Sequence, residues 1–199
     1  PNKAFDSLEK NGFEQLHTYF EKEGFELISC RSLNDLKKFE SYEFKYKSLF
    51  YLSVQYFRTK KMKDSAIESF KSDNFDVESI YSILAIILAL KITQNIAFDP
   101  KINYTLIEIK SKKTFIVGDQ PILNIHSDKI DKNGNTTDLS FYYPLSPKHS
   151  LRIDFDDKKE KYNLINPTEE EVDFYNNRML EESQLFVFAD NEQTLKNYT

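Results

Sequence analysis

The chain has 199 residues, with 27 Lys and Arg against 32 Asp and Glu, so its net charge is -5. This length favours one domain, and the acidic balance disfavours bulk nucleic-acid binding, which needs a basic surface. The single cysteine, Cys30, excludes an intramolecular disulfide and is typical of a reducing compartment, so we expect a cytoplasmic protein. The longest apolar stretch, residues 83–90, is shorter than the roughly 20 residues that span a bilayer, which predicts a buried helix and no membrane partner. No cofactor or oligomeric state follows from these properties.

The first half of the chain is predicted to be helical, because proline is absent between residues 2 and 99 and apolar residues recur at spacings of three and four. Residues 36–57 form one aromatic-rich helical face that ends in the basic run 58–63, where positive charge suits a helix C-terminus. Asp76 is a predicted N-cap for a helix over about 77–94. Because that helix is apolar nearly all round, we expect it at the centre of the fold.

The second half changes to strand patterns, beginning with alternating apolar and polar residues after Pro100. Asn133-Gly134 indicates a hairpin turn, and Pro167 followed by three glutamates indicates the start of a helix. The predicted strands cover residues 104–110, 114–117, 122–125, 139–143, 151–155 and 185–189. Helices followed by a mostly antiparallel sheet, a C-terminal helix and a final strand predict a single α+β domain over 1–199, with a helical part at about 1–98 and a sheet part at about 99–199.

Four segments carry a family resemblance: Phe57-Arg58-Thr59, the strand and turn 115–121, the corner 143–147, and the Asn176-Asn177 helix that leads into residues 186–189. In this order, from about Phe39 onward, they resemble the bacterial family called domain of unknown function 4238. Members typically open with a His-Phe-Ile-Pro-Gln-Phe-Tyr-Leu-like motif that nothing here matches, so we expect a member without that beginning. The family's name implies no activity, so the resemblance supports the fold and the choice of residues.

The turn Gly118-Asp119-Gln120-Pro121 ends an apolar strand, where partial burial could raise the pKa of Asp119 toward that of a general base. The alternative is that Asp119 caps its turn by accepting backbone N–H bonds. Arg58 could bind a carboxylate or phosphate, or pair with Asp119 at a side-chain distance of about 8 Å or less. With Gln120 and Asn177 these residues predict a polar pocket that binds a small anionic or nucleotide-like ligand. If the ligand is hydrolysed, Asp119 is the base and Arg58 stabilises charge.

Two other functions remain open: a non-catalytic interaction module, and a magnesium-assisted nuclease that uses Asp99, Glu108 and Lys110, the last two on one strand face. Ser146 and His149 are three residues apart, but no Gly-x-Ser-x-Gly elbow surrounds the serine, so we expect it to bond its own turn. The three histidines show no metal-binding spacing, and no metal site is predicted.

Two further expectations concern the same region. The amides of Asn176 and Asn177 interrupt a helix, and such amides usually satisfy nearby backbone groups. If the family's opening normally covers the sheet or completes the site, an exposed apolar patch is expected near the Asp119 turn.

Overall fold

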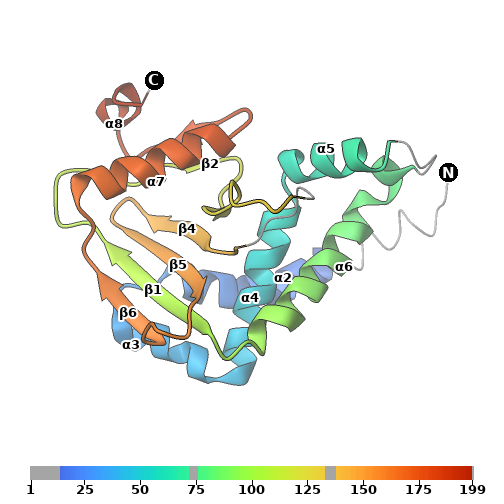
Figure 1. The fold of residues 1–199 in the computed structure, drawn as a ribbon, viewed down its shortest axis with the longest axis horizontal. Coiled ribbons are helices and arrows are strands. Elements are labelled where there is room, and N and C mark those ends of the chain that lie inside the picture. The colour runs from blue at the N-terminus through green and yellow to red at the C-terminus, as the bar shows by residue number, and fades with distance from the viewer. Residues whose placement is uncertain (1–13, 72–75, 133–137, 199) are drawn as a thin grey trace. The chain divides into compact units, whose positions relative to one another are not determined.

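The computed structural model describes residues 14–71, 76–132 and 138–198, and it confirms the α+β class (Figure 1). The chain divides into two compact units, a helical unit of Pro1–Ile28 and Phe39–Ala97 and a sheet unit of Ser29–Lys38 and Phe98–Thr199. The second boundary falls where the sequence pattern changes. Whether the two units act as one domain stays a prediction, and the Asn133-Gly134 turn lies outside the described residues.

The described part of the helical unit is built around the packing of α4 (Tyr42–Phe57) on α6 (Val77–Ala97), with α2 (Glu14–Ile28) and α5 (Lys60–Ser69) beside them. Small residues Ala85 and Ala89 of α6 face large side chains of α4, including Phe50. Buried hydroxyls join the two helices, because Thr93 donates to Ser53 Oγ at 3.1 Å. Asp76 accepts the Ser79 N–H, which confirms the predicted cap.

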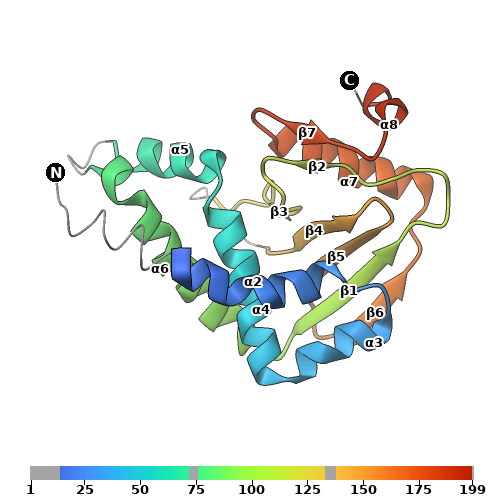
Figure 2. The same cartoon turned by 180° about the vertical axis from the view of Figure 1, so that it is seen from behind.

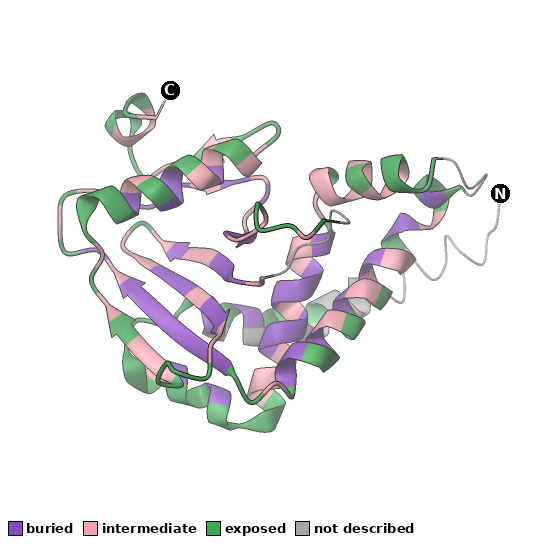
Figure 3. Cartoon of the chain, in the orientation of Figure 1, coloured by how far each residue is buried: buried purple, intermediate pink, exposed green. Residues whose placement is uncertain are grey.

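Helix α6 contributes to the core of the helical unit, but it is less buried than its sequence predicts. Ile87 is 55% exposed and Leu90 is 37% exposed, whereas Ala85 and Ala89 are buried. Small residues let two helix backbones approach closely, so α6 contacts α4 through the face of Ala85 and Ala89 and leaves Ile87 and Leu90 exposed. Figure 3 shows the mixture of buried and exposed positions along α6. By length and composition α6 could also cross a membrane. Only 33% of its most apolar window is buried, and core helices of soluble proteins pass the same test.

The sequence suggested that the basic run 58–63 ends one helix, but the structure places this run at the junction of two helices. Helix α4 ends at Phe57 with Arg58 as its C-cap, and the Thr59 side chain accepts the Met62 N–H to start α5. The lysines therefore lie in the first turn of α5, where the helix dipole disfavours them. An ion pair between Lys60 and Asp64 offsets part of this cost.

The sheet unit contains five strands in the order β3-β4-β5-β1-β6, antiparallel except for the parallel pair β1-β6 (Figures 1 and 2). Their bounds are β1 (Ile102–Glu108), β3 (Leu123–Asn124), β4 (Phe141–Ser146), β5 (His149–Phe155) and β6 (Tyr162–Ile165). A separate pair joins β2 (Val117–Gly118) to β7 (Val187–Phe188). The helices are α3 (Leu33–Leu36), which continues into the 3-10 helix η2 (Lys37–Glu40), α7 (Glu169–Glu182) and α8 (Glu192–Lys196).

Helix α7 packs on one face of the sheet. Tyr142 of β4 and Arg152 of β5 are paired in register and therefore share that face. The Tyr175 ring of α7 stacks on Tyr142 with centroids 4.4 Å apart, and its hydroxyl accepts a bond from Arg152. A capping box of Thr168 and Glu171 fixes the start of the helix. The face of α7 that turns away from this core is available for a site.

Candidate functional site

The carboxylate of Asp119 holds a distant segment of backbone. Its two oxygens accept the N–H groups of Gln184 and Leu185 at 2.9 and 2.8 Å, and its own N–H donates to Phe186 O at 3.0 Å. Both oxygens therefore have backbone partners, which favours the capping alternative, although the capped segment lies 65 residues along the chain. Gly118 is needed for space, because a Cβ there would lie 1.8 Å from Ser183 Oγ.

The other predicted pocket residues differ in their surroundings. Gln120 is buried and donates to Ile122 O at 2.9 Å, so its amide serves its own turn. Arg58 is exposed and belongs to the helical unit, so a site shared by Arg58 and Asp119 stays a prediction. Asn176 is fully buried and bonds Ile116 N and Thr114 O, which confirms its backbone role. Residues 114–116, which were predicted to be part of a strand, form none: Asn176 bonds two of their backbone groups, and Phe115 N donates to Pro147 O at 2.8 Å.

Asn177, the fourth predicted residue, lines a depression of about 430 Å³ within the sheet unit. One wall is the turn after β3, and the other is a face of α7 at i, i+3, i+4 and i+7 spacing. The lining side chains are Ile125, His126, Asp128 and Lys129 from the turn, and Phe174, Asn177, Arg178 and Glu181 from the helix. An aromatic ring, an amide and cationic groups thus converge on one small volume.

Charges at the depression are paired with one another. Asp138 Oδ2 lies 2.8 Å from His126 Nδ1 and 2.7 Å from Lys129 Nζ. The hydrogen bond from Lys129, together with the nearby charge of His126, holds the pKa of Asp138 below its usual range despite partial burial. Arg178 donates to Glu181 at 3.0 Å and to Ser127 Oγ at 2.9 Å. Glu182 Oε1 also lies 4.0 Å from Arg178 Nη2, and the guanidinium has five N–H donors in all.

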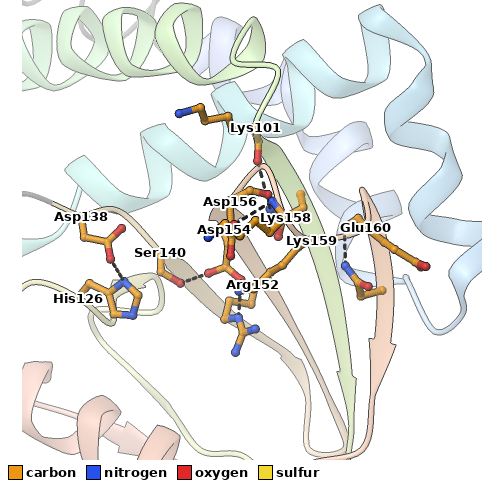
Figure 4. A network of polar contacts seen from close by, with 12 residues as sticks. Lys101, His126, Asp138, Ser140, Arg152, Asp154, Asp156, Lys158, Lys159 and Glu160 are labelled. Carbon is orange, nitrogen blue, oxygen red and sulfur yellow. Dashed lines mark hydrogen bonds and ion pairs between the residues drawn. The ribbon is translucent and has the colours of Figure 1, made fainter.

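A second polar network lies on the face of the sheet that α7 covers (Figure 4). The buried carboxylate of Asp154 accepts bonds from Ser140, Arg152 and Lys159. Burial alone would raise the pKa of Asp154, but the Ser140 hydrogen bond and the two cations lower it below its ordinary value. Each of these side chains is hydrogen-bonded to another member of the network. We therefore interpret the network as internal support for β4 and β5.

The nuclease arrangement is not assembled. Glu108 and Lys110 form an ion pair, but Asp99 precedes β1 and Glu108 ends it, which separates them by roughly 20 Å of extended strand. One metal cannot bind both, and no group of three or more His, Cys, Asp or Glu in the described residues is placed to hold one. Ser146 accepts the N–H groups of Lys148 and His149, which confirms that it bonds its own turn.

Three exposed apolar side chains lie on the segment that the Asp119 turn holds, and whether they form the expected patch stays a prediction. Leu185, Phe186 and Phe188 are each more than half exposed, and the two phenylalanine rings have centroids 6.3 Å apart. The segment that carries them is the one whose backbone Asp119 holds.

The sequence interpretation missed most of the depression. His126 and Asp138 are twelve residues apart, in no known motif, and only the pairing of β3 with β4 brings them together. For the helix wall a signal existed, because Phe174, Asn177 and Arg178 share one face of the helix predicted after Pro167.

The family described as Protein of unknown function (DUF4238) matches residues 8–193. The chain belongs to this family. As a DUF4238 member it matches across both units, including the turn at Asp119 and the helix that carries Asn177. Neither the curated proteins nor the solved structures contain a significant match.

Proposed function

We propose that this DUF4238 protein binds a small nucleotide-like ligand with one anionic group in the depression beside α7. The observation that supports it most is the convergence of Phe174, Asn177 and Arg178 from one helix face on the turn that holds Lys129. A half-exposed aromatic ring offers a stacking surface for a planar base. The amide and the guanidinium offer donors for a phosphate.

The charge distribution limits the ligand. Asp128 and Glu181 line the same depression, so a ligand with several negative charges meets repulsion as well as attraction. A single phosphate next to an uncharged base and sugar avoids most of that repulsion. We therefore expect nucleoside monophosphates to bind more tightly than the corresponding triphosphates.

Isothermal titration calorimetry with the ribonucleoside 5′-monophosphates tests this proposal. Asn177→Ala should weaken binding about tenfold, the effect of one lost hydrogen bond, because the side chain is exposed and its removal leaves the fold intact. Asn95→Ala, at an exposed site on α6, is the matched control and should bind like the wild type.

Asp119→Asn decides between the two candidate places. If the ligand binds beside α7, this variant lowers the melting temperature but keeps the affinity, because Asp119 only holds the Gln184–Leu185 backbone. Loss of affinity in Asp119→Asn together with wild-type affinity in Asn177→Ala would return the site to the Asp119 turn. Absence of binding by any monophosphate would refute the proposal.

The exposed side chains of Leu185, Phe186 and Phe188 favour a second candidate function, that of an interaction module. Such a module would use this apolar surface and not the depression. The double substitution of Phe186→Ser and Phe188→Ser should then leave monophosphate binding unchanged while abolishing any association of the protein with a partner.

A further inference from the structure

His126, which lines the depression, lies next to the carboxylate of Asp138. His126 Nδ1 is 2.8 Å from Asp138 Oδ2 as an ion-pair contact, and this nitrogen makes no hydrogen bond within the described residues. Figure 4 shows the other ring nitrogen pointing away from Asp138. The negative charge of a carboxylate next to Nδ1 favours the proton on that nitrogen, which leaves the lone pair of Nε2 available as a base.

A buried amide fixes the two segments that carry this pair. Asn124 Oδ1 accepts the backbone N–H groups of His126 at 3.2 Å and of Ser140 at 2.9 Å, while its Nδ2 donates to Asp138 O at 3.2 Å. Because Asn124 is itself in β3, the geometry of the pair is tied to the sheet. Ser140 is held in turn by Asp154. These hydrogen bonds are more than a surface turn needs to keep its conformation.

The imidazole also faces the depression, whose wall includes His126, Arg178 and Asn177. The ion pair with Lys129 keeps Asp138 ionised, so the carboxylate can stabilise an imidazolium once His126 has taken a proton. Arg178 supplies positive charge on the opposite wall, where it could stabilise charge that develops on a phosphate.

We propose that His126 is a general base that activates water for hydrolysis of a small phosphodiester bound in the depression, with Asp138 and Asn124 as positioning residues. This inference rests on the proposed function, because it uses the same nucleotide-like ligand. A phosphodiester carries one negative charge, which fits a depression lined by Asp128 and Glu181.

The reaction conserves atoms and charge without any redox step. Nε2 of His126 takes a proton from water as the water oxygen forms a bond to phosphorus. The bond from phosphorus to one ester oxygen breaks, and the imidazolium returns its proton to that leaving oxygen. A cyclic phosphodiester therefore gives a monophosphate and a free hydroxyl group.

The test uses 2′,3′-cyclic nucleoside monophosphates as probes, with product measured by chromatography and product binding measured by calorimetry. His126→Ala should lower kcat at least a hundredfold, a usual effect of removing a general base, while the affinity for the monophosphate changes little. His149→Ala is the matched control, since this histidine bonds Ser146 and does not line the depression, and it should keep full activity.

The pH dependence of kcat tests the positioning roles of Asp138 and Asn124. Asp138→Asn and Asn124→Ala should lower kcat with little change in KM, and should alter the pH profile of kcat, which His126→Ala flattens. The charged groups that face His126 are Asp138 before β4, Asp128 and Lys129 in its own turn, and Arg178 and Glu181 on α7. A merely structural role of Asn124 would lower the melting temperature without changing the pH profile.

The outcomes separate the two proposals. If the wild type binds monophosphates but leaves the cyclic diesters intact, or if His126→Ala is as active as the wild type, the general-base assignment is wrong and the ligand site stands. If no monophosphate binds, the ligand site and the base assignment both fail.

Discussion

At the scale of single residues, Asp154 shows how a buried charge is kept in this protein. The residue is 6% exposed, and its carboxylate has three donors, Ser140, Arg152 and Lys159. Arg152 is also well covered and depends on Asp154 and Tyr175 for its partners. Removing the carboxylate would leave the guanidinium with an uncompensated charge beneath α7.

Asp154→Ala is expected to lower the free energy of unfolding by about 3–5 kcal/mol, the usual cost of breaking a buried ion pair from one side. The pH dependence should change as well. Because the folded-state pKa of Asp154 lies below its ordinary value of 3.8, its contribution is present above about pH 4 and is lost as the pH falls through the folded-state pKa. Urea denaturation at pH 7 and between pH 4 and 2 measures both effects.

Asp157→Ala is the control for this measurement, since that side chain is exposed on the loop after β5. It should change the free energy of unfolding by no more than about 0.5 kcal/mol. A loss of less than 1 kcal/mol in Asp154→Ala, roughly the value of an exposed pair, would mean that the network is open to water in solution.

The hydrogen bonds of a side chain were predictable from the sequence only where the bonded residues are close along the chain. Asp76 capping its own helix and Ser146 bonding its own turn were both predicted, because three residues separate donor and acceptor. The partners of Asp119 lie 65 and 66 residues away, so the turn was recognised but its task was not. Gly118 is likewise explained by a distant residue, because a Cβ at this position would clash with Ser183.

At the scale of elements, α6 shows the limit of a periodicity argument. A helix that is apolar nearly all round has no amphipathic face to mark its buried side. The shapes of the side chains then decide the orientation, and the face of α6 that carries Ala85 and Ala89 packs against the large side chains of α4 while Ile87 stays exposed. The existence of the helix and its start were therefore predictable, while its orientation was not.

Ala89→Leu should destabilise the helical unit, because residue 89 is fully buried and three added carbons would force α4 and α6 apart. Overpacking of this kind costs about 1–3 kcal/mol. Ile87→Ser, two residues away on the exposed face, should cost no more than about 0.5 kcal/mol. Urea unfolding followed by circular dichroism compares the two. Equal losses of stability in the two variants would show that the face of α6 that carries Ile87 is covered in solution.

At the scale of the whole molecule, the division into units does not follow the order of the chain. The boundary near residue 98 was visible as a change from helical to alternating periodicity. The segment Ser29–Lys38 was assigned to the helical half, yet it belongs to the sheet unit, where α3 packs against β1 and β6. Nothing in so short a helix indicates which distant strands it will meet.

Leu36 in α3 offers a test of this division, because it is fully buried while Leu33 in the same helix is 39% exposed. Leu36→Ala should cost about 2–5 kcal/mol by leaving a cavity, and Leu33→Ala, the matched control, much less. The loss of stability should be confined to the sheet unit. Hydrogen exchange in the full chain should become faster in β1 and β6 and stay unchanged in α4 and α6, because cooperative units open separately. Equally faster exchange in the helical unit would contradict the assignment of Ser29–Lys38 and would show instead that the molecule opens as one.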